Sequence, residues 1–344
     1  MILRQAQDRP DTIGVIGAGA WGTALAQMLA SDGRDVLLWA FEPEVVAAIN
    51  SQHCNPLYLP SATLAPTIRA TGDLADFAAI ETALVGTPAQ VLGRVLAGLT
   101  TPPRDLVLCS KGIEAGSGRL MNDVARAACP GSAIAVLSGP TFAHEVAAGL
   151  PTAVTLACGG GGEQWERIAP AIARPAFRPY YSDDVTGAEI GGAVKNVLAI
   201  ACGVVDGLAL GQNARSALIA RGYAEMLRFG DALGAQGETL AGLCGLGDLV
   251  LTCSSTASRN FSLGKALGEG ANPAALMADR RTVAEGAHTA PVLAAIAAER
   301  GIAMPIVAAV DAILTGESAR AVVAELLARP LRAELESDAK DIEA

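Results

Sequence analysis

Ile13-Gly-Val-Ile-Gly-Ala-Gly-Ala-Trp-Gly22 is the stretch that decides the fold of this 344-residue chain. An apolar segment, predicted as a strand over residues 12–17, leads directly into Gly17-x-Gly19-x-x-Gly22, and a helix is predicted over residues 23–30. Glycines at this spacing let the backbone turn tightly and approach a pyrophosphate, and the free N–H groups of the helix N-terminus attract its charge. A glycine-rich turn without a ligand is the alternative, but the position between a strand and a helix predicts a dinucleotide site.

Short apolar segments recur through the first half of the chain and alternate with helical or turn-rich stretches. This alternation is typical of a doubly wound, mostly parallel sheet with helices on both faces. The predicted strands are residues 12–17, 35–40, 68–71, 82–85, 105–110, 133–137, 153–157 and 177–181. Beyond residue 186 the sequence becomes rich in alanine and leucine at helical spacing. We therefore predict an α/β Rossmann domain over residues 1–186, followed by an all-α domain over residues 187–344.

The composition limits the class of protein. With 51% hydrophobic and 17% charged residues, the chain has enough apolar material for a large core. A formal net charge of −10 argues against a nucleic-acid surface and against binding to an anionic membrane. An anionic substrate would therefore need a local cationic pocket.

No segment is predicted to span a membrane, because the longest uncharged stretch, residues 146–162, is broken by Pro151 and ends in four glycines. The first eleven residues lack the apolar core of a secretion signal. Seven scattered cysteines without a C-x-x-C pair are typical of reduced thiols and predict a cytoplasmic protein. His53, His144 and His288 are too dispersed to predict a metal site.

A lysine stands in the middle of an apolar run, Gly191-Gly-Ala-Val-Lys-Asn-Val-Leu-Ala-Ile200, that reads as a helix. Lysine is rarely buried without a partner, because removing its charge from water costs free energy. Lys195 therefore either meets an anion or takes part in chemistry; the alternative is a side chain that reaches solvent from a helix edge. A buried lysine together with a nucleotide site predicts a dehydrogenase.

The residues after the second predicted strand bear on the choice of nucleotide. Glu42 lies about twenty residues beyond the glycines, where a carboxylate can accept hydrogen bonds from the adenosine ribose and repel a 2′-phosphate. No lysine or arginine lies between residues 39 and 48. We therefore favour NAD over NADP; the alternative is that Glu42 is a solvated loop residue.

Three further residues carry candidate chemistry. Arg259 follows a run of hydroxyl residues, and a guanidinium can hold a phosphate through a forked pair of hydrogen bonds, with help from a helix N-terminus if one begins there. Lys111 follows an apolar strand, at the edge where doubly wound sheets bind ligands. Asp248, in Gly-Leu-Gly-Asp, could favour a charged lysine. The alternatives are a surface arginine for Arg259 and turn or cap residues for Lys111 and Asp248.

Nine blocks of the sequence are shared with one known family. They are Ile16-Gly-Ala-Gly-Ala-Trp-Gly-Thr-Ala-Leu25, Tyr58-Leu-Pro60, Ser110-Lys-Gly-Ile-Glu114, Leu137-Ser-Gly-Pro-Thr-Phe-Ala143, residues 191–196, Val205-Asp-Gly-Leu208, Gly245-Leu-Gly-Asp-Leu-Val-Leu-Thr252, Ser258-Arg-Asn260 and Val283-Ala-Glu-Gly286. With these blocks the chain resembles the bacterial-type NAD(P)-dependent glycerol-3-phosphate dehydrogenases over nearly its whole length.

The resemblance implies reversible hydride transfer between dihydroxyacetone phosphate and sn-glycerol 3-phosphate, which supplies the glycerol backbone of phospholipids. It implies that Lys195 is the general acid/base and that Asp248 stands beside it as a second catalytic residue. The substrate positions implied are Lys111, Gly139, Thr141, Lys195, Asp248, Ser258, Arg259 and Asn260. The cofactor positions, with those inferred above, are Gly17, Gly19, Ala20, Trp21, Gly22, Phe41, Glu42, Lys111, Ala143, Arg259, Val283 and Glu285.

Two positions depart from the family pattern. Phe41 stands where members often carry arginine or histidine, which puts the use of NADP in doubt and agrees with the interpretation of Glu42. His144 stands where lysine is common, and no consequence follows from it.

Two rival functions remain at this point. Another two-domain hydroxyacid dehydrogenase would share the glycine loop and the lysine but prefer a carboxylate substrate. A nucleotide-sensing protein without turnover would leave Lys195 and Arg259 unexplained. The apolar helical domain is also compatible with a homodimer.

Overall fold

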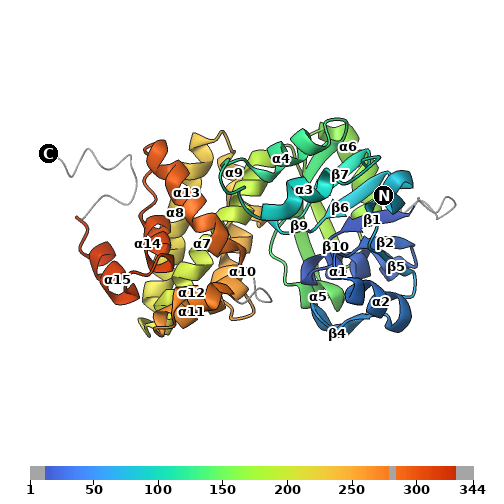
Figure 1. The fold of residues 1–344 in the computed structure, drawn as a ribbon. Helices are drawn as coiled ribbons and strands as arrows, with labels where there is room; N and C mark the ends of the chain where they lie inside the picture. The colour runs from blue at the N-terminus through green and yellow to red at the C-terminus, as the bar shows by residue number, and fades with distance from the viewer. Residues whose placement is uncertain (1–11, 279–283, 331–344) are drawn as a thin grey trace.

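The computed structural model of the chain describes residues 12–278 and 284–330. It consists of a lobe built on a sheet and a lobe built of helices (Figure 1). The outer limits predicted for the two domains, residues 1 and 344, lie outside the described residues, as does Val283.

The eight predicted strands form one eight-stranded sheet in the order β10-β9-β8-β7-β6-β1-β2-β5. Neighbouring strands run parallel except β9, which is antiparallel to β8. The doubly wound α/β prediction is therefore confirmed. The strands are β1 (Ile13–Ile16), β2 (Val36–Trp39), β5 (Ile68–Thr71), β6 (Thr82–Val85), β7 (Asp105–Leu108), β8 (Ala133–Ser138), β9 (Thr152–Cys158) and β10 (Phe177–Ser182).

A small antiparallel hairpin was not predicted from the sequence. It consists of β3 (Cys54–Asn55) and β4 (Leu59–Thr63) and lies between α2 (Pro43–Gln52) and β5. Two-residue strands give no alternating pattern, and a proline within a strand, here Pro60, argues against strand from sequence alone. The hairpin becomes important at the nucleotide site.

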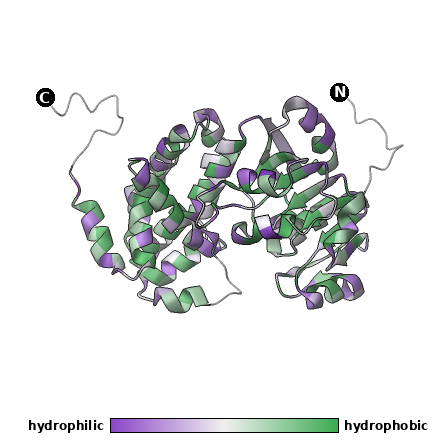
Figure 2. Cartoon of the chain, turned by 45° about the horizontal axis from the view of Figure 1, so that its top comes forward, coloured by the Kyte–Doolittle hydropathy of each residue, from purple (hydrophilic) through white to green (hydrophobic). Residues whose placement is uncertain are grey.

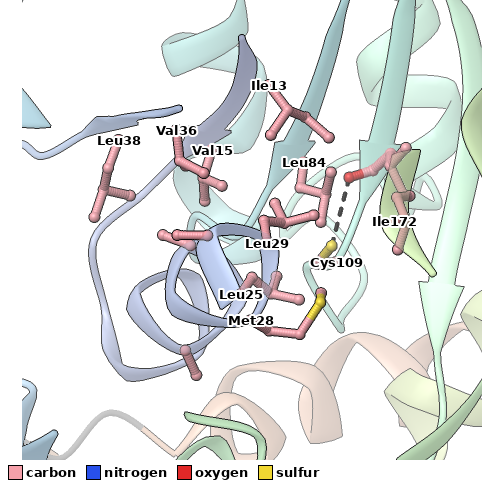
Figure 3. Close-up of a cluster of buried hydrophobic side chains, with 14 of the residues drawn as sticks. Ile13, Val15, Leu25, Met28, Leu29, Val36, Leu38, Leu84, Cys109 and Ile172 are labelled. Carbon is pink, nitrogen blue, oxygen red and sulfur yellow. Dashed lines mark hydrogen bonds between the residues drawn. The ribbon is translucent and has the colours of Figure 1, made fainter. Parts of the chain in front are cut away.

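Both faces of the sheet are covered, which explains why its strands are almost continuously apolar. Ile13 and Val15 of β1 belong to one core cluster, whereas Ile16 belongs to the cluster on the other face. Figure 3 shows the first of these cores, where Val15 and Leu84 face the helix that carries Leu25 and Leu29. Green, hydrophobic segments gather in the strands and the inner helices of both lobes in Figure 2.

Helices α1 to α6 belong to the sheet lobe. They are α1 (Ala20–Leu29), α2 (Pro43–Gln52), α3 (Leu92–Leu96), α4 (Met121–Ala128), α5 (Ala143–Ala147) and α6 (Gly161–Ile172). Helix α1 begins three residues before the predicted start, because Gly19, rather than the end of the glycine loop, is its N-cap.

From residue 185 the described part of the chain contains helices and no strand, as predicted for the second half. The helices are α7 (Val185–Gly207), α8 (Gly211–Ala232), α9 (Gly237–Ala241), α10 (Asp248–Cys253), α11 (Arg259–Gly268), α12 (Pro273–Ala278), α13 (Glu285–Glu299), α14 (Pro305–Leu314) and α15 (Ala319–Leu327).

Helix α7 is the central helix of this lobe. By length and apolar composition it could cross a membrane, a feature that the prediction of no span had overlooked. The apolar window of α7 is wholly buried inside the protein, however, which is the situation of a core helix. Its first turn also packs on the sheet side, where Val185 and Ala188 join the cluster that contains Ile16.

Helices α7 and α11 pack backbone against backbone. A Cβ atom added at Gly264 of α11 would lie 2.0 Å from the carbonyl oxygen of Ile200, and one added at Gly203 of α7 would lie 2.1 Å from that of Phe261. Any side chain at these positions would separate the helices. The glycines therefore hold the N-terminus of α11 against the middle of α7.

We predict that Gly264→Ala lowers the free energy of unfolding by about 1–3 kcal/mol, because the added methyl group overpacks a contact between two backbones. Urea unfolding measures the change. Gly162→Ala is the matched control, since Gly162 also lies in a helix but its Cβ would meet open space. Equal stability of the two variants would contradict the packing argument.

Candidate active site

Lys195 lies on α7 and is buried, with only 6% of its surface exposed. The alternative of a side chain that reaches solvent from a helix edge is therefore wrong. Its ammonium group donates hydrogen bonds to Oδ1 of Asp248 at 2.7 Å and to Oγ1 of Thr252 at 2.9 Å. Asp248 and Thr252 are four residues apart on α10, so they present one face of that helix to the lysine.

Asp248 is fully buried and joins two lysines. Its Oδ2 accepts a hydrogen bond from Nζ of Lys111 at 2.6 Å, while Oδ1 accepts that of Lys195. Asp248 opens α10 directly after a short π-helical turn, Leu243–Gly247. The turn can approach α7 because a Cβ at Gly191, one helical turn before Lys195, would lie 2.4 Å from the carbonyl oxygen of Cys244. Asp248 therefore connects Lys195 to Lys111 and is more than a turn residue.

The cluster carries two ammonium groups and one carboxylate and is therefore cationic in an acidic protein. Burial lowers the pKa of Lys195 to about 8; Asp248 acts to raise it and the charge of Lys111 acts to lower it further. At neutral pH most of the Lys195 groups are charged but close to the point of proton release. Such a group can serve as an acid or as a base.

Lys111 connects the cluster to the sheet lobe. It follows β7, and its ammonium group also donates to the carbonyl oxygen of Gly139 at 3.2 Å. Gly139 follows the neighbouring strand β8, and the hydroxyl of Thr141 donates to the same carbonyl at 3.3 Å. The predicted residues Lys111, Gly139 and Thr141 therefore meet at the carboxyl edge of the sheet, where α/β proteins bind ligands.

The start of α11 lies against α7, as the glycine packing requires. A helix does begin there, and Ser258 caps it by accepting a hydrogen bond from the N–H of Phe261 at 3.3 Å. The side chain of Asn260 donates to Asn196, the neighbour of Lys195, at 2.9 Å. Arg259 is the first residue of the helix and is exposed, so its guanidinium and the free N–H groups of the first turn are available to an anion.

Glu285 connects the helical lobe to the segment after β6. Burial raises the pKa of this carboxyl to about 7, while Arg259 and a hydrogen bond from the backbone N–H of Ala89 act to lower it. Arg259 and Glu285, both predicted as cofactor positions, are therefore neighbours.

The glycine loop has the geometry that a pyrophosphate requires. Gly17 has a φ of +109°, and a Cβ at Gly22 would lie 1.7 Å from the carbonyl oxygen of Gly17, so both glycines are needed for the turn itself. A Cβ at Gly19 would meet nothing within 4 Å. Since packing does not explain Gly19, its open side fits a nucleotide approaching the backbone. Ala20 and Trp21 follow as the first residues of α1.

The residues predicted to select the nucleotide lie beside this loop. Strands β1 and β2 are parallel neighbours, with Ile16 opposite Trp39, so their carboxyl ends emerge together. Phe41 is 79% exposed. Glu42 is not free in solvent, because its Oε1 accepts a hydrogen bond from the Tyr58 hydroxyl at 2.7 Å. Ala143 begins α5, which packs against α1.

Three residues at the site were not assigned a role from the sequence. Thr252 is bonded to Lys195, and its spacing of four from Asp248 was the available signal. Asn55 and Tyr58 belong to the unpredicted hairpin region, and only the Tyr-Leu-Pro block drew attention to it. Within residues 12–278 and 284–330, no group of three His, Cys, Asp or Glu side chains could hold a metal ion.

Comparison with known proteins gives one consistent family. The family model of the NAD-dependent glycerol-3-phosphate dehydrogenase N-terminus matches residues 12–162, and that of the C-terminus matches residues 184–324. The chain is 76% identical over 327 residues to glycerol-3-phosphate dehydrogenase [NAD(P)+] of Erythrobacter litoralis, covering 95% of this chain and 99% of that protein. It is 73% identical to the enzyme of the same name from Novosphingobium aromaticivorans, covering 94% and 98%.

A crystal structure of glycerol-3-phosphate dehydrogenase from Coxiella burnetii has the same fold as this chain. The TM-score is 0.87 at 38% sequence identity, and the match covers 92% of this chain and 99% of that one.

We predict that Asp248→Asn lowers the pKa of Lys195 below about 8, because the variant removes the carboxylate that favours the charged amine. NMR spectra of lysine labelled at Nζ, recorded against pH, measure the shift. Asp206→Asn is the control. Asp206 lies on α7, like Lys195, and accepts a hydrogen bond from Lys265 of α11 at 2.8 Å, but it does not contact Lys195. An unchanged or raised pKa in Asp248→Asn would contradict the electrostatic account.

Proposed function

The chain belongs to the NAD-dependent glycerol-3-phosphate dehydrogenase family, and we propose that its Lys195–Asp248–Lys111 cluster is the catalytic centre of that activity. The protein is an NAD(P)-dependent oxidoreductase that interconverts dihydroxyacetone phosphate and sn-glycerol 3-phosphate. A role in supplying the glycerol backbone of phospholipids is consistent with the family. The observation that carries the proposal is a buried lysine, bonded to a buried carboxylate, at the carboxyl edge of the nucleotide-binding sheet.

Reduction of the ketone requires one proton on its carbonyl oxygen. The nicotinamide nucleotide, when bound, supplies or accepts the hydride. Lys195 donates a proton from Nζ to the carbonyl oxygen of the ketone as negative charge develops there, a contribution typically of about 10²–10⁴-fold. In the oxidation direction the neutral amine removes the hydroxyl proton. A pKa of about 8 makes both protonation states accessible near neutral pH.

The neighbours of Lys195 orient this proton transfer. Asp248 holds both ammonium groups in place, and Thr252 accepts one of the three hydrogen bonds that Lys195 can donate. Lys111 adds a second positive charge that favours the oxyanion and an anionic substrate. Gly139 and Thr141 flank Lys111 on the substrate side.

We assign the phosphate of the substrate to the start of α11. Arg259 offers a forked guanidinium, and Ser258 and Asn260 fix the first turn whose N–H groups point to the same anion. A substrate with only a carboxylate near Lys195 would not need this phosphate site. This assignment separates the proposed activity from that of a related hydroxyacid dehydrogenase.

We assign the nucleotide to the loop of Gly17, Gly19 and Gly22 and to the N-terminus of α1, whose free N–H groups meet the pyrophosphate. The remaining cofactor contacts are proposed for Ala20, Trp21, Phe41, Glu42, Lys111, Ala143, Arg259 and Glu285. NAD or NADP serves as cofactor, and Phe41 with Glu42 supports a preference for NAD.

We further propose that the two domains divide between residues 186 and 187. We also propose that the protein is cytoplasmic and forms a homodimer. The seven cysteines are all free, which supports a reducing compartment. We expect light scattering to give a mass twice that of the chain; a mass of one chain would exclude a stable dimer.

We predict that the purified protein oxidises NADH with dihydroxyacetone phosphate and that Lys195→Ala lowers turnover by at least about 10²-fold while leaving nucleotide affinity unchanged. Absorbance at 340 nm measures turnover, and calorimetry measures NADH binding. Lys265→Ala, which removes a partly exposed lysine paired with Asp206, is the matched control. Turnover of Lys195→Ala equal to that of the control would exclude Lys195 as the acid/base.

The same assay separates the rivals through Arg259→Ala, for which we predict a rise of about tenfold or more in KM for dihydroxyacetone phosphate. An unchanged KM would favour a carboxylate substrate. Nucleotide binding without turnover of any carbonyl compound would favour a sensor.

A further inference from the structure

The hairpin missing from the sequence prediction contacts both halves of the nucleotide site. Its residue Asn55 is fully buried and donates from Nδ2 to the carbonyl oxygen of Ala18, inside the glycine loop, at 2.8 Å. The same nitrogen donates to Oγ1 of Thr23 at 2.9 Å, and Thr23 in turn donates to the Ala18 carbonyl at 3.1 Å. The hairpin therefore fixes the peptide that precedes Gly19.

Tyr58 extends these contacts to the other half of the site. Its backbone N–H donates to Oδ1 of Asn55 at 3.2 Å, and its hydroxyl donates to Oε1 of Glu42 at 2.7 Å. A continuous set of hydrogen bonds thus runs from Ala18 through Asn55 and Tyr58 to Glu42. One turn of the chain, residues 55–58, therefore holds both the glycine loop and the Glu42 carboxylate.

Glu42 is the N-cap residue of α2, and its side chain makes no capping hydrogen bond. Without another partner it would rotate freely, and fixing it for a ligand would cost conformational entropy. Tyr58 removes part of that freedom before a ligand binds. Its own freedom is small, because a tyrosine has two side-chain torsions and this one is partly buried. A preorganised acceptor binds a ribose hydroxyl more tightly than a mobile one.

The phenol of Tyr58 is the donor in this hydrogen bond. Burial and the Glu42 carboxylate raise the pKa of Tyr58 to about 12, so the phenol keeps its proton and remains the donor. Glu42 is then the acceptor, and its second oxygen can accept from a 2′-hydroxyl. A 2′-phosphate would instead meet a carboxylate that cannot turn away without losing the bond to Tyr58.

We propose that Tyr58 is a positioning residue that sets the selectivity of this enzyme for NAD over NADP, by holding the Glu42 carboxylate toward the adenosine ribose. The proposal rests on the nucleotide site assigned above. It adds a residue that does not itself touch the reacting atoms but decides which nucleotide the loop and Glu42 accept.

The test is the variant Tyr58→Phe, which removes one hydroxyl and keeps the ring. Calorimetric titration with NADH and with NADPH, without substrate, gives the affinity for NADH divided by the affinity for NADPH. We expect this ratio to fall by about tenfold, mainly through weaker NADH binding, since a hydrogen bond to a charged group is lost. Tyr180→Phe is the matched control, because Tyr180 is half exposed on β10, the edge strand at the far end of the sheet from β2 and β5.

A second variant shows whether Tyr58 acts through Glu42. Glu42→Ala alone should lower the ratio at least as much as Tyr58→Phe, and adding Tyr58→Phe to Glu42→Ala should change it no further. An affinity ratio in Tyr58→Phe equal to that of Tyr180→Phe would overturn the proposal. A full tenfold fall in the Glu42→Ala background would also overturn it, because Tyr58 would then act by another route.

Binding and turnover keep this proposal separate from the proposed function. The expected ratios in a protein that turns over no dihydroxyacetone phosphate would overturn the assigned reaction and leave the role of Tyr58 intact. Unchanged ratios in an active enzyme would overturn the role of Tyr58 alone. Equal urea midpoints of Tyr58→Phe and Tyr180→Phe exclude loss of folding as the cause of a changed ratio.

Discussion

One buried carboxylate between two ammonium groups is the interaction on which the rest of the site depends. Lys195 could not remain charged in the apolar middle of α7 without Asp248, because an unpaired buried charge would be strongly unfavourable. Asp248 also accepts from Lys111, which follows a strand of the sheet lobe. The same carboxylate therefore pairs the lysine that we propose as the acid/base and joins the two lobes where the substrate is proposed to bind.

Close backbone contacts make this pairing possible. The π-helical turn before Asp248 reaches α7 at Gly191, and α11 reaches it at Gly203 and Gly264. As a result, α7 contacts both the turn before Asp248 and the start of α11, which we propose binds the phosphate. The cationic cluster formed in this way has the opposite sign to the protein as a whole, so an anionic substrate is favoured locally rather than by the overall field.

The nucleotide site has a comparable support that its motif does not reveal. The glycine loop provides open backbone at Gly19, but Asn55 holds the peptide before it and Tyr58 holds Glu42. The proposed cofactor site is thus built from the glycine loop, the N-cap of α2 and a hairpin turn. On our proposal, its selectivity for the nucleotide depends on this arrangement rather than on Glu42 alone.

The sequence by itself determined every strand of the main sheet and the glycine loop, because apolar runs and glycine spacing are local signals. It left open whether a helix begins at Arg259, which the structure decided. It also marked Lys195, since a charge in an apolar run is visible without a structure. Only the tertiary structure decided that Asp248 bonds both Lys195 and Lys111, which are 53 and 137 residues away from it. It alone revealed the hairpin and its hold on Glu42. The physical reason is that a contact between distant residues leaves no periodic pattern in either segment, so it exists only once the chain has folded.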